Sequence, residues 1–191
     1  VASKECEMKD LKGKTIAIPG ELTTAYLLLQ LYEPDFRSNV KVMPFHEIMG
    51  AVKEGKADAG LIIHESRFTY KSYGLKRVID LGEWWEEETG LPIPLGCIIA
   101  KRSLGIELIE KLERLIRESV QYAKSRRDEP VKYIKEHSQE LDDSVIDEHI
   151  KLYVNDYSID IGDDGIRAVR KLLDMAEERG IIKKSSKPLF V

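Results

Sequence analysis

The chain has 191 residues, enough for one substantial core or two modest ones. It carries 30 basic and 34 acidic residues, a net charge of −4 and no basic block, which argues against nucleic-acid binding through phosphate neutralisation. No apolar run reaches the roughly 18 residues of a membrane helix, so no membrane span is predicted. A content of 42% hydrophobic and 34% charged residues indicates a folded globular protein.

Two strand–helix–strand units are predicted in the first third of the chain. The strands are residues 14–18, 39–44 and 57–63, and the helices between them are residues 24–32 and 45–55. The apolar run at 61–63 lacks alternation, which indicates a strand buried on both faces, as in a parallel sheet. With right-handed crossovers, this part of the chain is predicted to form a parallel α/β sheet.

The rest of the chain changes from strands to helices. Short strands are predicted at 78–81 and, after a Pro- and Gly-rich turn, at 95–100. From residue 105 onward only helices are predicted: one with an apolar stripe over 108–123, one from 130, and two over 142–154 and 165–180. The α/β lobe is therefore followed by a helical region.

Three domain parts are predicted from this layout. Residues 1–13 are expected to be a strand or hinge remnant of a first lobe, because the chain opens at Val1 in the manner of a continuation. Residues 14–96 form the α/β lobe that carries the site, and residues 97–191 form a return strand and helices that pack on the first lobe. The N-terminal part of the other lobe is expected to be missing from this sequence.

The start of the first helix is a candidate anion site. Gly20 follows a strand, and Thr23 and Thr24 open a helix, so free N–H groups and two hydroxyls would converge there. Such a site suits a carboxylate or a phosphate. The segment is not a P-loop, and an ordinary helix cap is the alternative interpretation.

His64 is the candidate base. It ends an apolar strand at the edge where α/β sheets bind ligands, and imidazole can take a proton near neutral pH. Glu65 or Arg67 could bind substrate or orient this ring, while a histidine satisfied by backbone groups is the alternative. Leu95 and Gly96, at the end of the Pro- and Gly-rich turn, are further predicted ligand contacts, because glycine permits close backbone approach.

No metal site is indicated. His46, His137 and His149 do not show zinc-binding spacing, and Cys6 and Cys97 lie far apart, outside any Cys-x-x-Cys pair. A reduced cytoplasmic setting fits these cysteines best, although one disulfide between them is left open.

Five segments, in order along the chain, resemble the 1,4-dihydroxy-6-naphthoate synthases of the futalosine route to menaquinone. They are residues 18–26 (IPGELTTAY), 63–70 (IHESRFTY), 81–85 (LGEWW), 90–96 (GLPIPLG), and 153–155 (YVN) with Gly162. Two departures from the family pattern are Ser66, where many relatives have glycine, and the missing N-terminal lobe segment.

This resemblance implies a type II periplasmic-binding-protein fold, with two α/β lobes around a cleft. It also implies a lyase that converts cyclic dehypoxanthine futalosine to 1,4-dihydroxy-6-naphthoate with no metal or organic cofactor. His64 would be the catalytic base, and Thr23 and Thr24 would help to hold the carboxylated substrate.

Two other functions stay open at this point. A chorismate dehydratase of the same fold would act on another carboxylated substrate, and a solute-binding protein would bind a small carboxylate without turning it over. The segment at 64–70 favours the naphthoate enzyme over the first. The absence of an apolar stretch before Cys6 argues against the second. A homodimer is a further possible partner arrangement.

Overall fold

A parallel sheet of three short strands, in the order β2-β1-β3, organises the first part of the chain in the computed structural model. The strands are β1 (Ile16–Ile18), β2 (Val40–Val42) and β3 (Ala59–Gly60). Ile16 lies opposite Val40 on one side and Ala59 on the other, and both pairings are parallel. The predicted parallel α/β sheet is confirmed, although all three strands are shorter than the sequence indicated. The prediction that residues 61–63 lie in a strand buried on both faces is wrong, because β3 ends at Gly60 and these three residues are half-buried and outside the strand.

The structure describes residues 1–138 and 142–190, and the chain divides into two units. Unit 1 contains residues 1–95 and 168–184, and unit 2 contains residues 96–167 and 185–191. Residues 139–141 and 191 belong to the predicted C-terminal region and lie outside the described residues.

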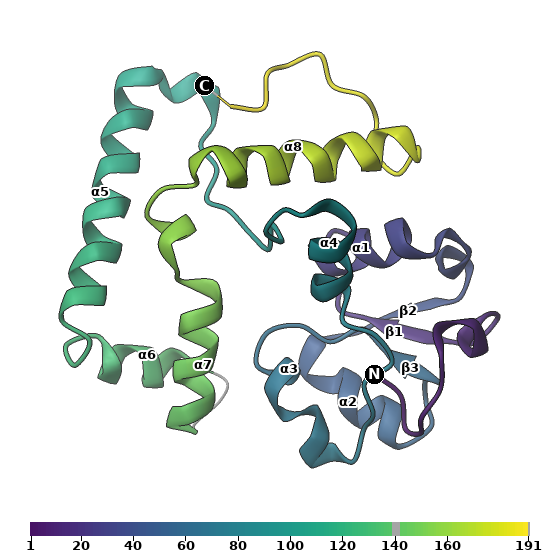
Figure 1. Cartoon of the computed structure of the whole chain (residues 1–191). Helices are drawn as coiled ribbons and strands as arrows, with labels where there is room; N and C mark the ends of the chain where they lie inside the picture. The colour runs from purple at the N-terminus through teal and green to yellow at the C-terminus, as the bar shows by residue number, and fades with distance from the viewer. Residues whose placement is uncertain (139–141, 191) are drawn as a thin grey trace. The chain divides into compact units, whose positions relative to one another are not determined.

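Helices cover both faces of the sheet in unit 1. The predicted crossover helices are confirmed as α1 (Thr24–Tyr32) and α2 (Phe45–Lys53). Successive residues of β1 point to opposite faces, so Ile16 and Ile18 enter a core with residues of α1, α4 (Leu81–Thr89) and α8 (Gly162–Glu178). Ala17 enters a second core with residues of α2, on the other face (Figure 1).

Short elements complete unit 1. They are η1 (Met8–Leu11), η2 (Pro34–Ser38), α3 (Ser66–Thr69) and η3 (Tyr70–Tyr73). The first residues lie beside β3, because Ala2 makes antiparallel bridges with Ala59 and Lys76.

The strands predicted at 78–81 and 95–100 are wrong. Leu81 is the first residue of α4, because the Asp80 carboxylate accepts hydrogen bonds from the N–H groups of Gly82 and Glu83 and so caps a helix there. Residues 95–100 form no strand, and the side chains of Ile98 and Ile99 are 77% and 87% exposed. A strand needs a backbone partner, and the structure gives residues 95–100 none.

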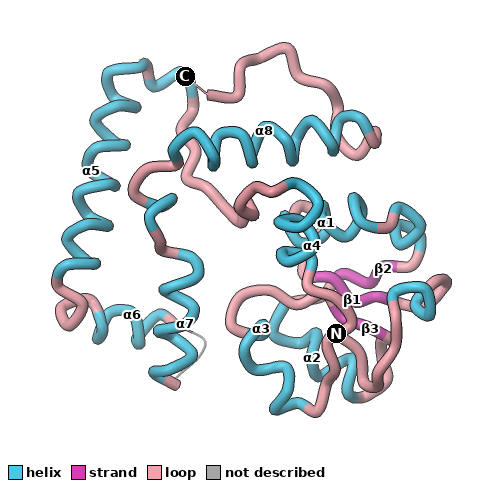
Figure 2. The backbone as a smooth tube through the Cα atoms, in the orientation of Figure 1, coloured by secondary structure: helices cyan, strands magenta, loops and turns pink. Residues whose placement is uncertain are grey.

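Unit 2 is helical. It contains η4 (Arg102–Leu104), α5 (Ile106–Ser125), α6 (Val131–His137), α7 (Asp143–Tyr153), η5 (Asp156–Ser158) and the first residues of α8. The predicted helices are confirmed, and among the described residues the strands occur only in unit 1 (Figure 2). None of the helices in the described ranges is both long and apolar enough to span a bilayer.

The apolar stripe of α5 is only partly covered. No side chain of α5, α6 or α7 is fully buried. Leu108, Leu112 and Leu115 of the stripe are 42%, 37% and 48% exposed. Isolated helices of this length are marginal in water, and packing of an apolar face usually supplies most of their stability. Unit 2 therefore has a much smaller core than unit 1.

Two glycines of unit 1 give a matched test of this packing. A Cβ at Gly60 in β3 would lie 2.5 Å from Ile48 Cγ2 and 2.9 Å from Val52 Cγ2, both in α2. Overpacking of this kind costs about 1–3 kcal/mol, so Gly60→Ala should lower the free energy of unfolding by that amount.

Gly50→Ala is the control, because a Cβ at this position in α2 meets nothing within 4 Å. This change should raise the free energy of unfolding by about 0.5–1 kcal/mol, since alanine favours the helix. Urea denaturation followed by circular dichroism measures both. Equal stability of the two variants would contradict the close approach of α2 to β3.

Candidate active site

The segments that follow the three strands leave the sheet at the same edge. The N–H of Leu61, just after β3, donates to the carbonyl of Ala17 at 2.8 Å, and the N–H of Met43, just after β2, donates to the carbonyl of Ile18 at 3.1 Å. Residues 19–20, 44–45 and 63–64 are therefore neighbours at the carboxyl edge, where ligands bind in sheets of this kind.

His64 has an unusual backbone conformation at this edge. Its φ of 55° is in the left-handed region. Among the residues that the structure describes, it is the only non-glycine residue with a positive φ. This conformation costs about 1–2 kcal/mol for a residue with a Cβ. The imidazole is half-buried, with its edge against the ring of Phe45 at 5.1 Å between centroids and 67° between planes. Strain of this kind clusters at functional sites.

The hydroxyls at the start of α1 are engaged within the protein. Thr23 caps the helix: its oxygen accepts from the Tyr26 N–H at 3.2 Å, and its hydroxyl donates to the Gly20 carbonyl at 2.8 Å. Thr24 donates to the Leu95 carbonyl at 3.1 Å. The structure thus brings together Gly20 with Thr23, and Thr24 with Leu95. The other first-turn N–H groups of a helix have no partner within the helix and can face an anion.

Tyr26 is the third residue of the same helix and is 7% exposed. Burial raises the pKa of its phenol, the negative charge of Glu21 raises it further, and Arg37 acts in the opposite direction. The phenol therefore stays protonated at neutral pH. It adds no negative charge to the start of α1, where an anion would bind.

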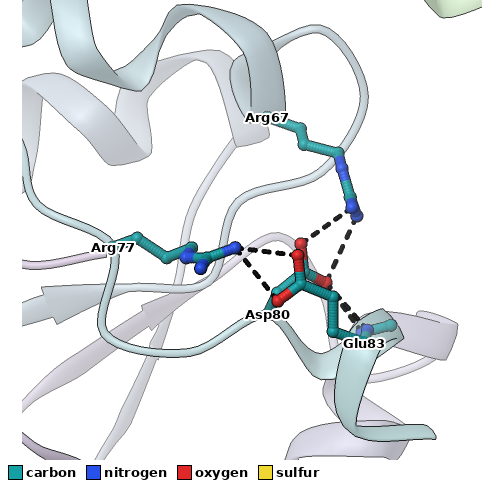
Figure 3. A network of polar contacts seen from close by, with 5 residues as sticks. Arg67, Arg77, Asp80 and Glu83 are labelled. Atoms are coloured by element: carbon teal, nitrogen blue, oxygen red, sulfur yellow. Dashed lines mark hydrogen bonds and ion pairs between the residues drawn. The ribbon is translucent and has the colours of Figure 1, made fainter. Parts of the chain in front are cut away.

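Arg67 is paired with Asp80. Its guanidinium lies 2.8 Å from one carboxylate oxygen and 3.3 Å from the other, and the same carboxylate caps α4 (Figure 3). A second pair, between Arg77 and Glu83 at 2.9 Å, lies beside it. Arg67 is thus held by protein groups in this structure.

Most of the other residues singled out in the sequence are exposed. Gly96 is exposed and is the first residue of unit 2. His46 is exposed and has its ring 5.7 Å from Phe45. Cys6 and Cys97 are both free thiols. Across residues 1–138 and 142–190, no cluster of three or more His, Cys, Asp or Glu side chains could hold a metal ion.

A shallow hollow of about 280 Å³ lies in unit 1, and none of the predicted site residues lines it. Its lining residues are Tyr70, Lys71, Gly74, Leu75, Lys76 and Arg77.

Sequence reasoning missed two residues that contact the predicted site residues. Phe45 contacts His64, and Asp80 holds Arg67. A signal for Asp80 was available, because an Asp followed three residues later by Glu83 is a typical helix start. The contact of Phe45 joins two distant segments and has no local signal.

The backbone strain at His64 predicts an unusual order of stabilities. His64→Gly and His64→Ala both remove the ring, but glycine adopts the left-handed conformation without steric cost. The free energy of unfolding of the glycine variant should therefore be higher than that of the alanine variant by roughly 1 kcal/mol. Glu65, with φ of −62°, is the control, and there the alanine variant should be the more stable. Urea denaturation distinguishes the two orders, and a less stable His64→Gly would contradict the strain.

Comparison with known proteins supports one family. A family model described as "Menaquinone biosynthesis" matches residues 1–178. A "1,4-dihydroxy-6-naphtoate synthase" from Streptomyces coelicolor is 50% identical over 177 residues, which cover 91% of this chain and 63% of that protein. A protein of the same name from Thermus thermophilus is 50% identical over 184 residues, covering 96% of this chain and 67% of that protein.

The fold is shared with a solved structure. The crystal structure of protein AF1704 from Archaeoglobus fulgidus matches with a TM-score of 0.88 and 42% identity, over 95% of this chain and 67% of that chain. This chain thus spans about two thirds of the length of each of these proteins. The resemblance noted in the sequence is confirmed, and the chain belongs to the menaquinone biosynthesis family.

Proposed function

We propose that this chain carries the active site of a cofactor-free carbon–carbon lyase that converts cyclic dehypoxanthine futalosine to 1,4-dihydroxy-6-naphthoate. The observation that carries the proposal is the 50% identity to two proteins that bear the synthase name. The position of His64 at the carboxyl edge of the sheet supports it.

His64 is the base in this proposal. It removes a proton from the cyclic substrate, and the electron pair of that bond forms a new double bond as a carbon–carbon bond breaks. The electrons of the broken bond leave with the remaining fragment, which takes up a proton, and the bicyclic ring system becomes aromatic as the dihydroxynaphthoate is released. Because aromaticity drives the reaction, the protein needs mainly a well-placed base and a held substrate. A fixed backbone at His64 suits that task, since a left-handed residue has few conformations nearby.

The start of α1 is the proposed carboxylate site. Because the Thr23 and Thr24 hydroxyls donate to the carbonyls of Gly20 and Leu95, the donors left for a carboxylate are backbone N–H groups at the helix start. Thr23 and Thr24 then act by shaping the loop that presents these groups. Gly96, next to Leu95, is proposed to let the substrate approach the backbone.

We also propose that the full fold is the two-lobed type II periplasmic-binding-protein fold, with the site in the cleft. The matched relatives are longer than this chain, which spans 63% and 67% of their lengths. The exposed leucines of α5 offer an apolar surface that further chain of this kind could cover.

Replacement of His64 tests the proposed reaction. In the complete polypeptide encoded by the gene that contains this sequence, His64→Gln should lower kcat for cyclic dehypoxanthine futalosine by about 10²–10⁴-fold, because a positioned base contributes that much. Product formation is followed by chromatography of the dihydroxynaphthoate.

His46→Gln is the matched control, because His46 contacts the same Phe45 ring from an exposed position, and kcat should stay close to that of the unmodified protein. Near-normal turnover by His64→Gln would reject the base assignment. Turnover of chorismate in place of the cyclic substrate would assign the protein to the dehydratase, and binding without turnover of either would assign it to the solute-binding proteins.

A further inference from the structure

The turn that carries His64 is tied to α4 by one ion pair. Arg67 lies in α3, which begins two residues after His64. The backbone N–H of Arg67 donates to the His64 carbonyl at 3.3 Å. Its guanidinium meets the Asp80 carboxylate at 2.8 and 3.3 Å, a two-pronged contact that fixes direction as well as distance. The pair therefore links the catalytic turn to a helix start.

Asp80 is a firm anchor for this pair. Its side chain is 12% exposed, and one of its oxygens also accepts the N–H groups of Gly82 and Glu83 at 2.9 and 3.2 Å. A Cβ at Gly82 would lie 3.7 Å from Arg67 Nη1, so the guanidinium rests against the first turn of α4. The carboxylate and the helix start thus hold the arginine from one side.

α4 in turn is fixed to the core of unit 1. Trp85 is fully buried, and its indole N–H donates to the Pro92 carbonyl at 3.1 Å. The ring of Trp84 stands edge-on to Tyr32 of α1 at 5.4 Å. Tyr32 is the last residue of α1, so α4 packs on the end of α1 that lies away from Thr24. The start of α1 is joined instead to the segment after α4, because the Thr24 hydroxyl donates to the Leu95 carbonyl.

We propose that Arg67 and Asp80 are positioning residues that hold the His64 imidazole in place relative to the start of α1. The expected effect on kcat rests on the proposed function, whereas the expected displacement of the His64 ring does not. It assigns Arg67 to the support of His64 instead of to contact with the substrate. The left-handed backbone of His64 needs such support, because strained conformations persist only where the surroundings determine them.

The test compares single and double variants of the pair. Arg67→Met removes the charge and keeps most of the stem, while Asp80→Asn keeps an oxygen that can cap α4. Each single variant should lower kcat by roughly 10-fold with little change in KM, since small displacements of catalytic groups can cost up to about 10²-fold. The double variant should be no worse than the poorer single one, because both remove the same contact. Arg67→Lys should restore part of the loss.

A second measurement is independent of activity. The chain has four histidines, and the Cε1–Hε1 NMR signal of His64 is identified by its loss in His64→Gln. This signal should move in Arg67→Met and in Asp80→Asn, measured on the 191-residue chain without substrate. The signals of His137 in α6 and His149 in α7 should stay in place, and an unchanged circular dichroism spectrum shows that the variants are folded.

The neighbouring ion pair provides the control. Arg77 and Glu83 meet at 2.9 Å on the first turn of the same helix, with side chains 52% and 55% exposed, and neither belongs to the turn that carries His64. Arg77→Met and Glu83→Gln should leave both the His64 signal and kcat unchanged.

Two results would overturn the proposal. One is an unmoved His64 signal in both Arg67→Met and Asp80→Asn. The other is a rise in KM for the Arg67 variant alone, with Asp80→Asn like the unmodified protein, which would make Arg67 a substrate ligand. If the complete unmodified protein does not convert the cyclic substrate, the proposed function fails, and the NMR comparison still decides the positioning role.

Discussion

The backbone pairing of β1 with β2 on one side and β3 on the other is the constraint on which the candidate site depends. Parallel strands end at the same edge, so three segments far apart in sequence emerge side by side there. The contact between Phe45 and His64 joins the segments that follow β2 and β3, the two outer strands. Gly60 in β3 lets α2 pack closely on the sheet, so the helix that begins with Phe45 is held against it.

The helix α4 and the segment after it contact the two halves of the site separately. The buried Trp85 joins α4 to the core, and the first turn of α4 holds Arg67. The Leu95 carbonyl, in the segment after α4, accepts the hydroxyl of Thr24. The His64 turn is therefore held by a helix, and the start of α1 by the segment that follows this helix. Sites that need precise placement are better built on helices than on loops alone.

Unit 2 is stabilised in a more local way. Asp142 caps α7 by accepting the N–H groups of Ser144 and Val145, and the Ser144 hydroxyl bond is the main cause that lowers the pKa of this carboxyl. Ion pairs one turn apart join Glu113 to Arg117 in α5 and Glu148 to Lys151 in α7. These interactions depend on sequence neighbours and support helices of which no side chain is fully buried.

The sequence by itself determined the elements whose signals are local: the two strand–helix–strand units and the helices after residue 105. It placed His64 at a strand end, whereas β3 ends at Gly60 and His64 lies in the segment that follows. The tertiary structure decided which short apolar runs became strands, since 78–81 and 95–100 resembled 16–18 but lack a backbone partner. It also decided that Arg67 meets Asp80 and that Thr24 meets Leu95. The physical reason is that a strand and a long-range hydrogen bond each need a partner from a second segment. The pattern of residues within one segment does not identify that partner.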